Sequence, residues 1–271
     1  MTDRITDTVI PDAWGTLRRF TQARIALGRA GSSLPTQPHL DFQFAHARAR
    51  DAVHHTLAIE PLRAGLVERG LGVVTVHSAA ADRPTYLKRP DLGRRLDAAS
   101  RERLETYRAP GGKDFDVAFV IADGLSAFAI EQNALAFLDV MLPRVPAESW
   151  RIAPLVIAEQ GRVAIGDEIA VALRARMVVV LVGERPGLSS PDSMGLYLTW
   201  QPAVGTTDAR RNCISNVRRE GMSFELAAHK LLYLMTEARG RHLSGVLLKD
   251  EVEAPPERLA APGGNFLTED T

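Results

Sequence analysis

The chain of 271 residues contains a single cysteine, Cys213, and carries no excess of charge of either sign. One cysteine excludes an internal disulfide and a zinc site built from cysteines, and it is typical of a reducing compartment. Lys and Arg together number 33, as do Asp and Glu, so the formal net charge is zero. Because proteins that wrap nucleic acid or lie on a membrane surface need a positive excess, this neutrality argues against both classes.

Long hydrophobic runs are also missing. The longest aliphatic run, residues 177–182, is far shorter than the ~20 residues that span a bilayer. The first residues carry acids and lack the apolar stretch of a signal peptide. We therefore expect a cytoplasmic protein without membrane contact.

Several motifs that mark catalytic or nucleotide-binding loops are absent. The chain has no G-x-x-x-x-G-K-[ST], no G-x-G-x-x-G and no G-x-S-x-G. Residues 28–33 are superficially similar to a phosphate loop, but they follow a predicted helix and are better explained as a helix stop. None of the spacings among His39, His46, His54 and His55 is that of a helical metal site, so we predict no metal ligand.

Residues 1–71 predict a helical N-terminal arm. Apolar residues recur at helical spacing from Trp14 to Leu27, and a second helix is predicted over 44–69, ended or kinked by Pro61. The apolar face of the first helix could dock on a partner or pack against this chain's own sheet, and the pattern leaves both open.

Residues 72–248 predict an α/β domain, because continuous apolar runs alternate there with helical patterns. We predict an open, largely parallel, Rossmann-like sheet flanked by helices. Residues 249–271 are rich in proline, glycine and acids, and we predict a disordered tail. The predicted strands are 73–76, 117–121, 155–158 and 177–182, with a further strand over 196–200 that could lie at an edge; the predicted helices are 92–107, 126–142, 163–174 and 223–239, with a loop over 84–90.

Three loops follow predicted strands: 122–126, 159–163 and 183–192. In open α/β sheets, ligands bind outside the carboxyl ends of the strands, so these loops predict the site. The amino termini of the helices that follow would offer backbone N–H groups to a ligand. In the third loop, Glu184 either forms a surface salt bridge in a rigid connector or faces donors of a ligand.

Cys213 lies in the Arg-rich segment 210–216. Neighbouring guanidinium groups could lower the pKa of its thiol and make it a nucleophile. No His or Asn partner is evident, so a small residue packed against a ligand or the core is the favoured interpretation.

Five stretches together closely resemble the small subunit of ethanolamine ammonia-lyase. They agree in order and spacing, and the resemblance runs from about residue 14 to about residue 248. The stretches are RIALGRAGSSLPT (24–36), FAHARARDAVH (44–54), DVAFVIADGLSA (116–127), GERPGLSSPDS (183–193) and RNCISNVRREG (211–221).

The resemblance implies a subunit of an adenosylcobalamin-dependent carbon–nitrogen lyase that converts ethanolamine to acetaldehyde and ammonia. It implies a large catalytic subunit, a TIM barrel, that holds the substrate, while this chain is inactive alone and closes over the cofactor. By position, the family's cobalamin contacts fall on Val163, Glu184 and Cys213. Because the D-x-H-x-x-G pattern of histidine-ligated cobalamins is absent, we expect this chain to supply no metal ligand.

The resemblance also gives the arm an expected partner, since Trp14, Leu17 and Phe20 would dock on the large subunit. A location inside a bacterial microcompartment is left open. Two alternatives remain beside the lyase subunit: a stand-alone α/β enzyme that uses Cys213 or Glu184, and a non-catalytic interaction protein without a small ligand.

Overall fold

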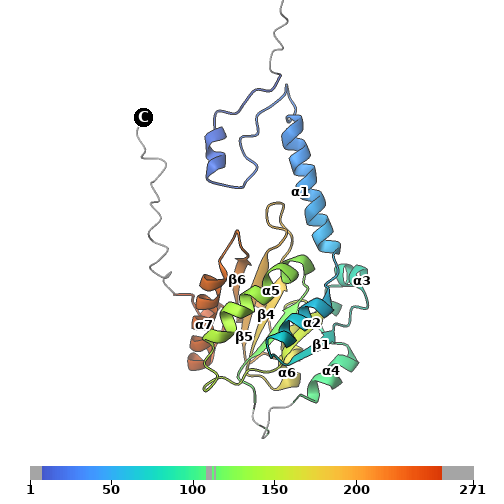
Figure 1. Ribbon diagram of the computed structural model, residues 1–271, viewed down its shortest axis with the longest axis vertical. Coiled ribbons are helices and arrows are strands. Elements are labelled where there is room, and N and C mark those ends of the chain that lie inside the picture. The colour runs from blue at the N-terminus through green and yellow to red at the C-terminus, as the bar shows by residue number, and fades with distance from the viewer. Residues whose placement is uncertain (1–7, 108–111, 113, 252–271) are drawn as a thin grey trace, which may run out of the picture.

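The computed structural model describes residues 8–107, 112 and 114–251, which form a six-stranded sheet with helices on both faces (Figure 1). Four strands run parallel in the order β1-β3-β2-β4, and β5 and β6 extend the sheet antiparallel beside β4. The strands are β1 Val73–His77, β2 Ala118–Ala122, β3 Leu155–Glu159, β4 Met177–Gly183, β5 Met194–Trp200 and β6 Arg211–Val217.

The α/β class is confirmed, but the sheet is mixed rather than largely parallel. The predicted parallel strands are present, and β5 lies inside the sheet because β6 takes the edge. The reason for the reversal lies in the connection: the loop 184–193 between β4 and β5 contains no helix. A short connection without a crossover returns the chain antiparallel.

Two apolar cores lie on opposite faces of the sheet. Side chains of α2, α5 and α7 pack on one face, and those of α4 and α6 pack on the other. The strands β2 and β4 are buried at every position, as expected for strands covered on both faces. The longer helices are α1 Thr36–His54, α2 Ile59–Glu68, α4 Ala98–Glu105, α5 Ala127–Met141, α6 Ile165–Leu173 and α7 Phe224–Arg241.

Three predicted helices are confirmed within a few residues of their predicted ends: 126–142 is α5, 163–174 is α6 and 223–239 is α7. The predicted helix 92–107 divides into a 3₁₀ turn, Leu92–Arg94, and α4. The predicted loop 84–90 contains most of a short helix, α3 Arg83–Lys88, which Asp82 caps by accepting from the Thr85 N–H.

The N-terminal segment differs most from the prediction. The first predicted helix is reduced to a 3₁₀ turn, Gly15–Arg19, with no buried residue. The predicted helix 44–69 is two helices, α1 and α2, separated before Pro61, which stands in the first turn of α2. A proline is tolerated there because that N–H has no helical partner.

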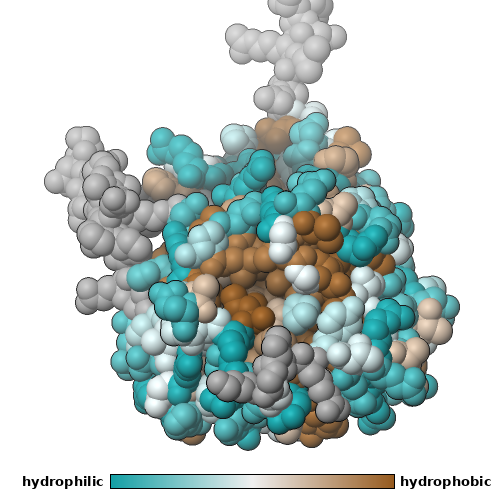
Figure 2. All heavy atoms as spheres, turned by 60° about the horizontal axis from the view of Figure 1, so that its bottom comes forward, coloured by the Kyte–Doolittle hydropathy of each residue, from teal (hydrophilic) through white to brown (hydrophobic). Residues whose placement is uncertain are grey.

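The two ends of the sheet differ in their surroundings. α1 extends away from the helices that cover the sheet (Figure 1). At the opposite end, where β1 and β3 begin, a hollow of about 460 Å³ is lined mainly by apolar side chains, among them Leu71, Leu142 and Ile152. Viewed from that end, apolar side chains form a continuous area bordered by polar ones (Figure 2). Among the described helices, none is long and apolar enough to cross a bilayer.

The predicted disordered tail falls almost entirely outside the described residues.

Candidate functional site

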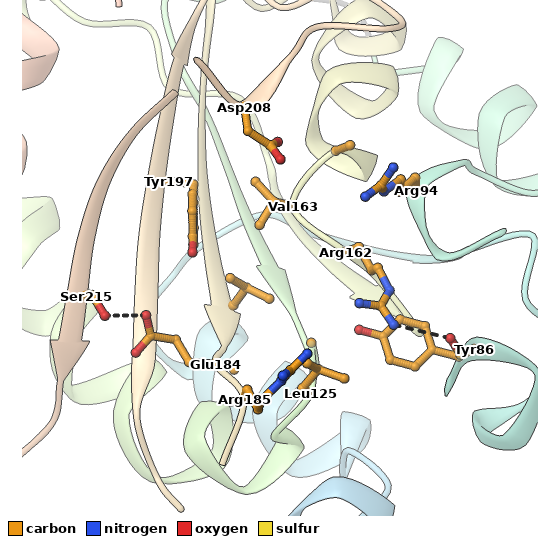
Figure 3. Close-up of a pocket in the computed structure, with 14 residues that line it drawn as sticks. Tyr86, Arg94, Leu125, Arg162, Val163, Glu184, Arg185, Tyr197, Asp208 and Ser215 are labelled. Atoms are coloured by element: carbon orange, nitrogen blue, oxygen red, sulfur yellow. Dashed lines mark hydrogen bonds between the residues drawn. The ribbon is translucent and has the colours of Figure 1, made fainter. Parts of the chain in front are cut away.

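A cavity of about 530 Å³ lies where the central strands end (Figure 3). All three predicted loops contribute to its wall: Gly124 and Leu125 after β2, Arg162 and Val163 after β3, and Glu184 after β4. The expectation that these loops meet at one edge of the sheet is confirmed. The wall is completed by residues from α3, the 3₁₀ turn at 92–94, β5, β6 and the segment before β6, namely Tyr86, Arg94, Tyr197, Ser215 and Asp208.

On the cavity-facing side of β5 and β6, α6 reaches only the end near Arg211, where its Asp167 pairs with Arg211. Leu196 and Ile214 point to the core formed with α5 and α7, so their neighbours along each strand point the other way. On that other side, Tyr197 and Ser215 line the cavity. Alternation along two antiparallel strands therefore produces one apolar face for the core and one polar face for the site.

The Glu184 side chain is held by donors from two other segments. Its carboxylate accepts hydrogen bonds from the Ser193 hydroxyl, from the Ser215 hydroxyl at 2.5 Å and from the Asn216 N–H at 3.1 Å. To reach β6 it crosses β5 at Gly195, where an added Cβ would lie 3.0 Å from a Glu184 carboxylate oxygen. A glycine at this position leaves room for the carboxylate to span the two strands.

The surface salt bridge considered for the third loop is not formed. No ion pair joins Glu184 to a cation among the residues that the structure describes, and its partners are hydroxyl and amide donors. The Glu184 N–H donates to the Ser193 carbonyl at 2.9 Å and closes the loop on itself. The carboxylate is therefore fixed in place at the cavity wall.

Val163 and Glu184 line the same cavity, and Cys213 lies beside it. Cys213 stands on β6 opposite Tyr197. The residue is exposed, yet partial desolvation raises the pKa of its thiol, and the Glu184 charge adds to the shift, although the Tyr197 side chain opposes it. A raised pKa leaves less thiolate, which disfavours the nucleophile interpretation.

Asp123 is a buried residue at the site that sequence reasoning missed. It directly follows β2 and accepts from the N–H groups of Gln160 at 3.0 Å and Gly161 at 2.9 Å, and from Arg83 at 3.3 Å. Burial raises the pKa of Asp123 to about 6, against the Arg83 charge and the backbone donors. The carboxyl group thus ties the loop after β3, which carries Val163, to the end of β2.

The signal for Asp123 was present in the sequence, since an acid directly after a continuous apolar strand is an expensive group to bury without a partner. Its partner Arg83 could not be found in this way, because Arg83 and Asp123 are 40 positions apart. Tyr86, one helical turn from Arg83, is fully buried and contacts both the Arg83 and the Arg162 guanidinium groups.

The amino terminus of α6 does not offer the backbone donors that we expected. The N–H groups of Ile165, Gly166 and Asp167 donate to carbonyls of residues 162–164 within the same turn. At α5, the Ser126 hydroxyl caps the Ala129 N–H in the same manner. Donors at this end of the cavity therefore come chiefly from side chains.

The part of the chain that the structure describes holds no cluster of three or more His, Cys, Asp or Glu side chains that could bind a metal ion. The cavity instead combines a fixed carboxylate, hydroxyl groups, several apolar side chains and several guanidinium groups. Such a surface is suited to non-covalent binding of a large ligand that carries both amide and anionic groups.

Comparison with known proteins gives one consistent result. The family model of the ethanolamine ammonia-lyase light chain matches residues 11–249. The small subunit of ethanolamine ammonia-lyase from Azotobacter vinelandii is 59% identical over 98% of this chain and 98% of its own length. The small subunit from Pseudomonas aeruginosa is 57% identical over 96% and 98%, and that from Xanthomonas campestris is 58% identical over 90% of each chain.

Proposed function

This chain belongs to the ethanolamine ammonia-lyase light-chain family, and from that premise we propose that its cavity binds adenosylcobalamin at the interface with the large subunit. The assembled enzyme converts ethanolamine to acetaldehyde and ammonia, and this chain is inactive alone. When bound, the cofactor supplies radical chemistry through its cobalt–carbon bond. Val163, Glu184 and Cys213 hold the cofactor's periphery.

The observation that supports this proposal best is the fixed carboxylate of Glu184. The rim of the corrin ring carries carboxamide groups, whose N–H donors suit a carboxylate that is already oriented by Ser193 and Ser215. Because these partners hold Glu184 before a ligand arrives, little side-chain entropy is lost on binding. The residues present therefore fit the group.

The size and openness of the cavity support the proposal that a second chain completes the binding site. The cofactor is larger than a cavity of about 530 Å³, and the part of the polar face of β5 and β6 around Tyr197 and Ser215 lines this open cavity. A subunit that covers this face would enclose the remainder of the cofactor and exclude water from it. The name small subunit, carried by the relatives, implies such a large-subunit partner.

A partner surface on the arm is a further part of the proposal. Trp14 and Phe20 are 68% and 59% exposed, whereas Leu17 is half-buried. Exposed aromatic side chains of this kind are common anchors of protein interfaces. We assign the large subunit as the occupant.

A reconstitution assay tests the function. The purified chain should show no turnover, and activity should appear when it is mixed with the large subunit and adenosylcobalamin. Turnover by this chain alone, lost in Cys213→Ala or Glu184→Gln, would favour a stand-alone enzyme. Full activity of the large subunit without this chain, and no cobalamin dependence of their association, would favour an interaction protein.

A further inference from the structure

The cavity has two chemically different sides (Figure 3). Glu184, Tyr197 and Ser215 lie on one side, where the carboxylate is an acceptor. Arg94 and Arg162 lie on the other side with Tyr86, and Arg185 lies between the two sides, near Glu184 and Leu125. A ligand that fits both sides needs N–H donors at one end and a negative charge at the other.

The three arginines that line the cavity have no anionic partner within the described residues. No carboxylate oxygen lies within 4.0 Å of a nitrogen of Arg94, Arg162 or Arg185. Other arginines near the site are paired. Arg83 contacts Asp123 at 3.3 Å, and Arg211 contacts Asp167 at 2.7 Å. The charge of the basic side is therefore available to a ligand.

Arg162 is held in place at the centre of this side. Its guanidinium lies 4.6 Å from the ring centre of buried Tyr86 and donates to the Tyr86 carbonyl at 3.4 Å. Its backbone N–H donates to the Gly93 carbonyl at 2.8 Å. Its Nε is buried without a hydrogen-bond partner among the described residues. An unpaired buried donor on an ordered arginine is costly unless a ligand supplies an acceptor.

Gly93 brings Arg94 next to this group. An added Cβ at Gly93 would lie 2.8 Å from the Tyr86 ring and 3.1 Å from the Gln160 carbonyl, so only glycine allows this approach. The turn that carries Arg94 is thus packed directly on Tyr86 and bonded to Arg162. Two guanidinium groups on adjoining turns form one basic site, to which Arg185 adds a third from the loop after β4.

This inference rests on the proposed function. We propose that Arg94, Arg162 and Arg185 bind the phosphodiester group in the nucleotide loop of the cofactor. Glu184 binds the carboxamide groups at the rim of the corrin ring. Guanidinium groups match phosphate oxygens in geometry and charge. The amino terminus of α6 cannot serve instead, because its first N–H groups are bonded within the turn. The assignment fixes the direction in which the cofactor lies across the cavity.

The test measures binding to the assembled complex of both subunits by isothermal titration, without turnover. Three ligands are compared: adenosylcobalamin, adenosylcobinamide phosphate, which keeps the phosphate and lacks the base, and adenosylcobinamide, which lacks both. Arg162→Gln and Arg94→Gln should weaken binding of the first two ligands by about tenfold or more and leave the third unchanged. Arg162→Lys, which keeps the charge, should recover part of the loss.

Arg63→Gln is the matched control, because Arg63 is an exposed arginine on α2 that pairs with Glu60. An equal loss for all three ligands, or no loss in either variant, would overturn the assignment. Arginine-dependent binding of inorganic phosphate, with all three cobalt compounds bound alike, would also overturn it in favour of a free-anion site.

The two proposals fail differently. If the wild-type complex binds none of the three cobalt compounds, the proposed function itself is wrong. If it binds them and depends on Glu184 but not on the arginines, only the phosphodiester assignment is wrong.

Discussion

At the scale of single residues, the site is built from side chains that are oriented by partners on other strands. Glu184 illustrates this, since its hydrogen-bond donors are Ser193 in the loop before β5 and Ser215 on β6. Gly195 on β5 leaves room for the carboxylate to reach both. Such a carboxylate can accept hydrogen bonds from a ligand effectively, because its orientation is fixed and no cationic side chain of the described residues neutralises its charge. Its replacement therefore tests the cofactor contact with little risk to the fold.

Glu184→Gln should lower the affinity of the assembled enzyme for adenosylcobalamin about tenfold, because one charged acceptor becomes neutral. Equilibrium binding followed by absorbance measures the effect. Glu60→Gln is the control, as Glu60 is an exposed carboxylate on α2. Unchanged affinity in Glu184→Gln would show that the carboxylate does not contact the cofactor.

Asp123 predicts an unusual dependence of stability on pH. Its pKa is about 6 in the folded chain and about 3.9 when unfolded. Between these values the folded state binds the extra proton, so the free energy of unfolding should fall as pH rises from about 4 to about 6, by roughly 2–3 kcal/mol. Asp123→Asn should remove this contribution, as measured by urea unfolding across that range.

Asp139→Asn provides a control of opposite sign. A hydrogen bond from Arg69 lowers the pKa of Asp139, which is half-exposed on α5. Its ionised form therefore contributes a small stability that is lost as pH falls. A wild-type slope that Asp123→Asn leaves intact would contradict the role given to the buried carboxyl.

At the scale of secondary-structure elements, the sequence predicted the strands and helices that form the core. The strands β2, β3 and β4 and the helices α5, α6 and α7 carry apolar patterns set by burial, and these patterns are local. The first predicted helix has the right spacing, but its segment buries no residue of the 3₁₀ turn and leaves Trp14 exposed. A short helix without tertiary contacts is marginal in water, and only a 3₁₀ turn remains.

β6 escaped prediction because its polar residues face the cavity. Only Arg211, Ile214 and Val217 are buried along it, so the strand has few apolar positions. Arg211 is buried because it pairs with Asp167 on α6 through two bonds of 2.7 Å. Because the two partners are 44 positions apart, no local sequence pattern indicates that Arg211 is buried. From the sequence alone, the segment is only an Arg-rich stretch.

Arg211→Met should destabilise the chain by about 3–5 kcal/mol, because it leaves the Asp167 carboxylate buried without its cation. Urea unfolding measures the loss. Arg174→Met, which removes an exposed pair with Asp114, should lose less than about 1 kcal/mol. Equal effects of the two substitutions would show that the pair between β6 and α6 does not fasten the edge strand.

At the scale of the whole molecule, the site and the arm point to one partner. The sequence predicted the loops of the cavity, but not the side chains Arg83, Tyr86 and Asp123 that hold them, since these meet only in the folded chain. The proposed large-subunit surface depends on both the cavity side of β5 and β6 around Tyr197 and Ser215 and the exposed aromatics of the arm.

Trp14→Ala combined with Phe20→Ala should weaken association with the large subunit about tenfold or more, because aromatic anchors carry much of an interface's binding energy. Co-purification and analytical ultracentrifugation measure the effect. Leu247→Ala, at a side chain 71% exposed but far from the arm in sequence, should leave association unchanged. Undiminished assembly of the double variant would exclude the arm as an anchor.

The alternation along β5 and β6 has an evolutionary consequence. Because packing depends on one set of side chains and ligand recognition on the intervening set, each set is free to diverge at its own pace. Under the proposed function, single exchanges at Tyr197, Cys213 or Ser215 change the preference for a ligand without repair of the interior. In the regular stretch that pairs residues 196–199 with 211–214, an inserted residue would, by contrast, invert both sets together, so the length of this stretch should be far less variable than its polar residues.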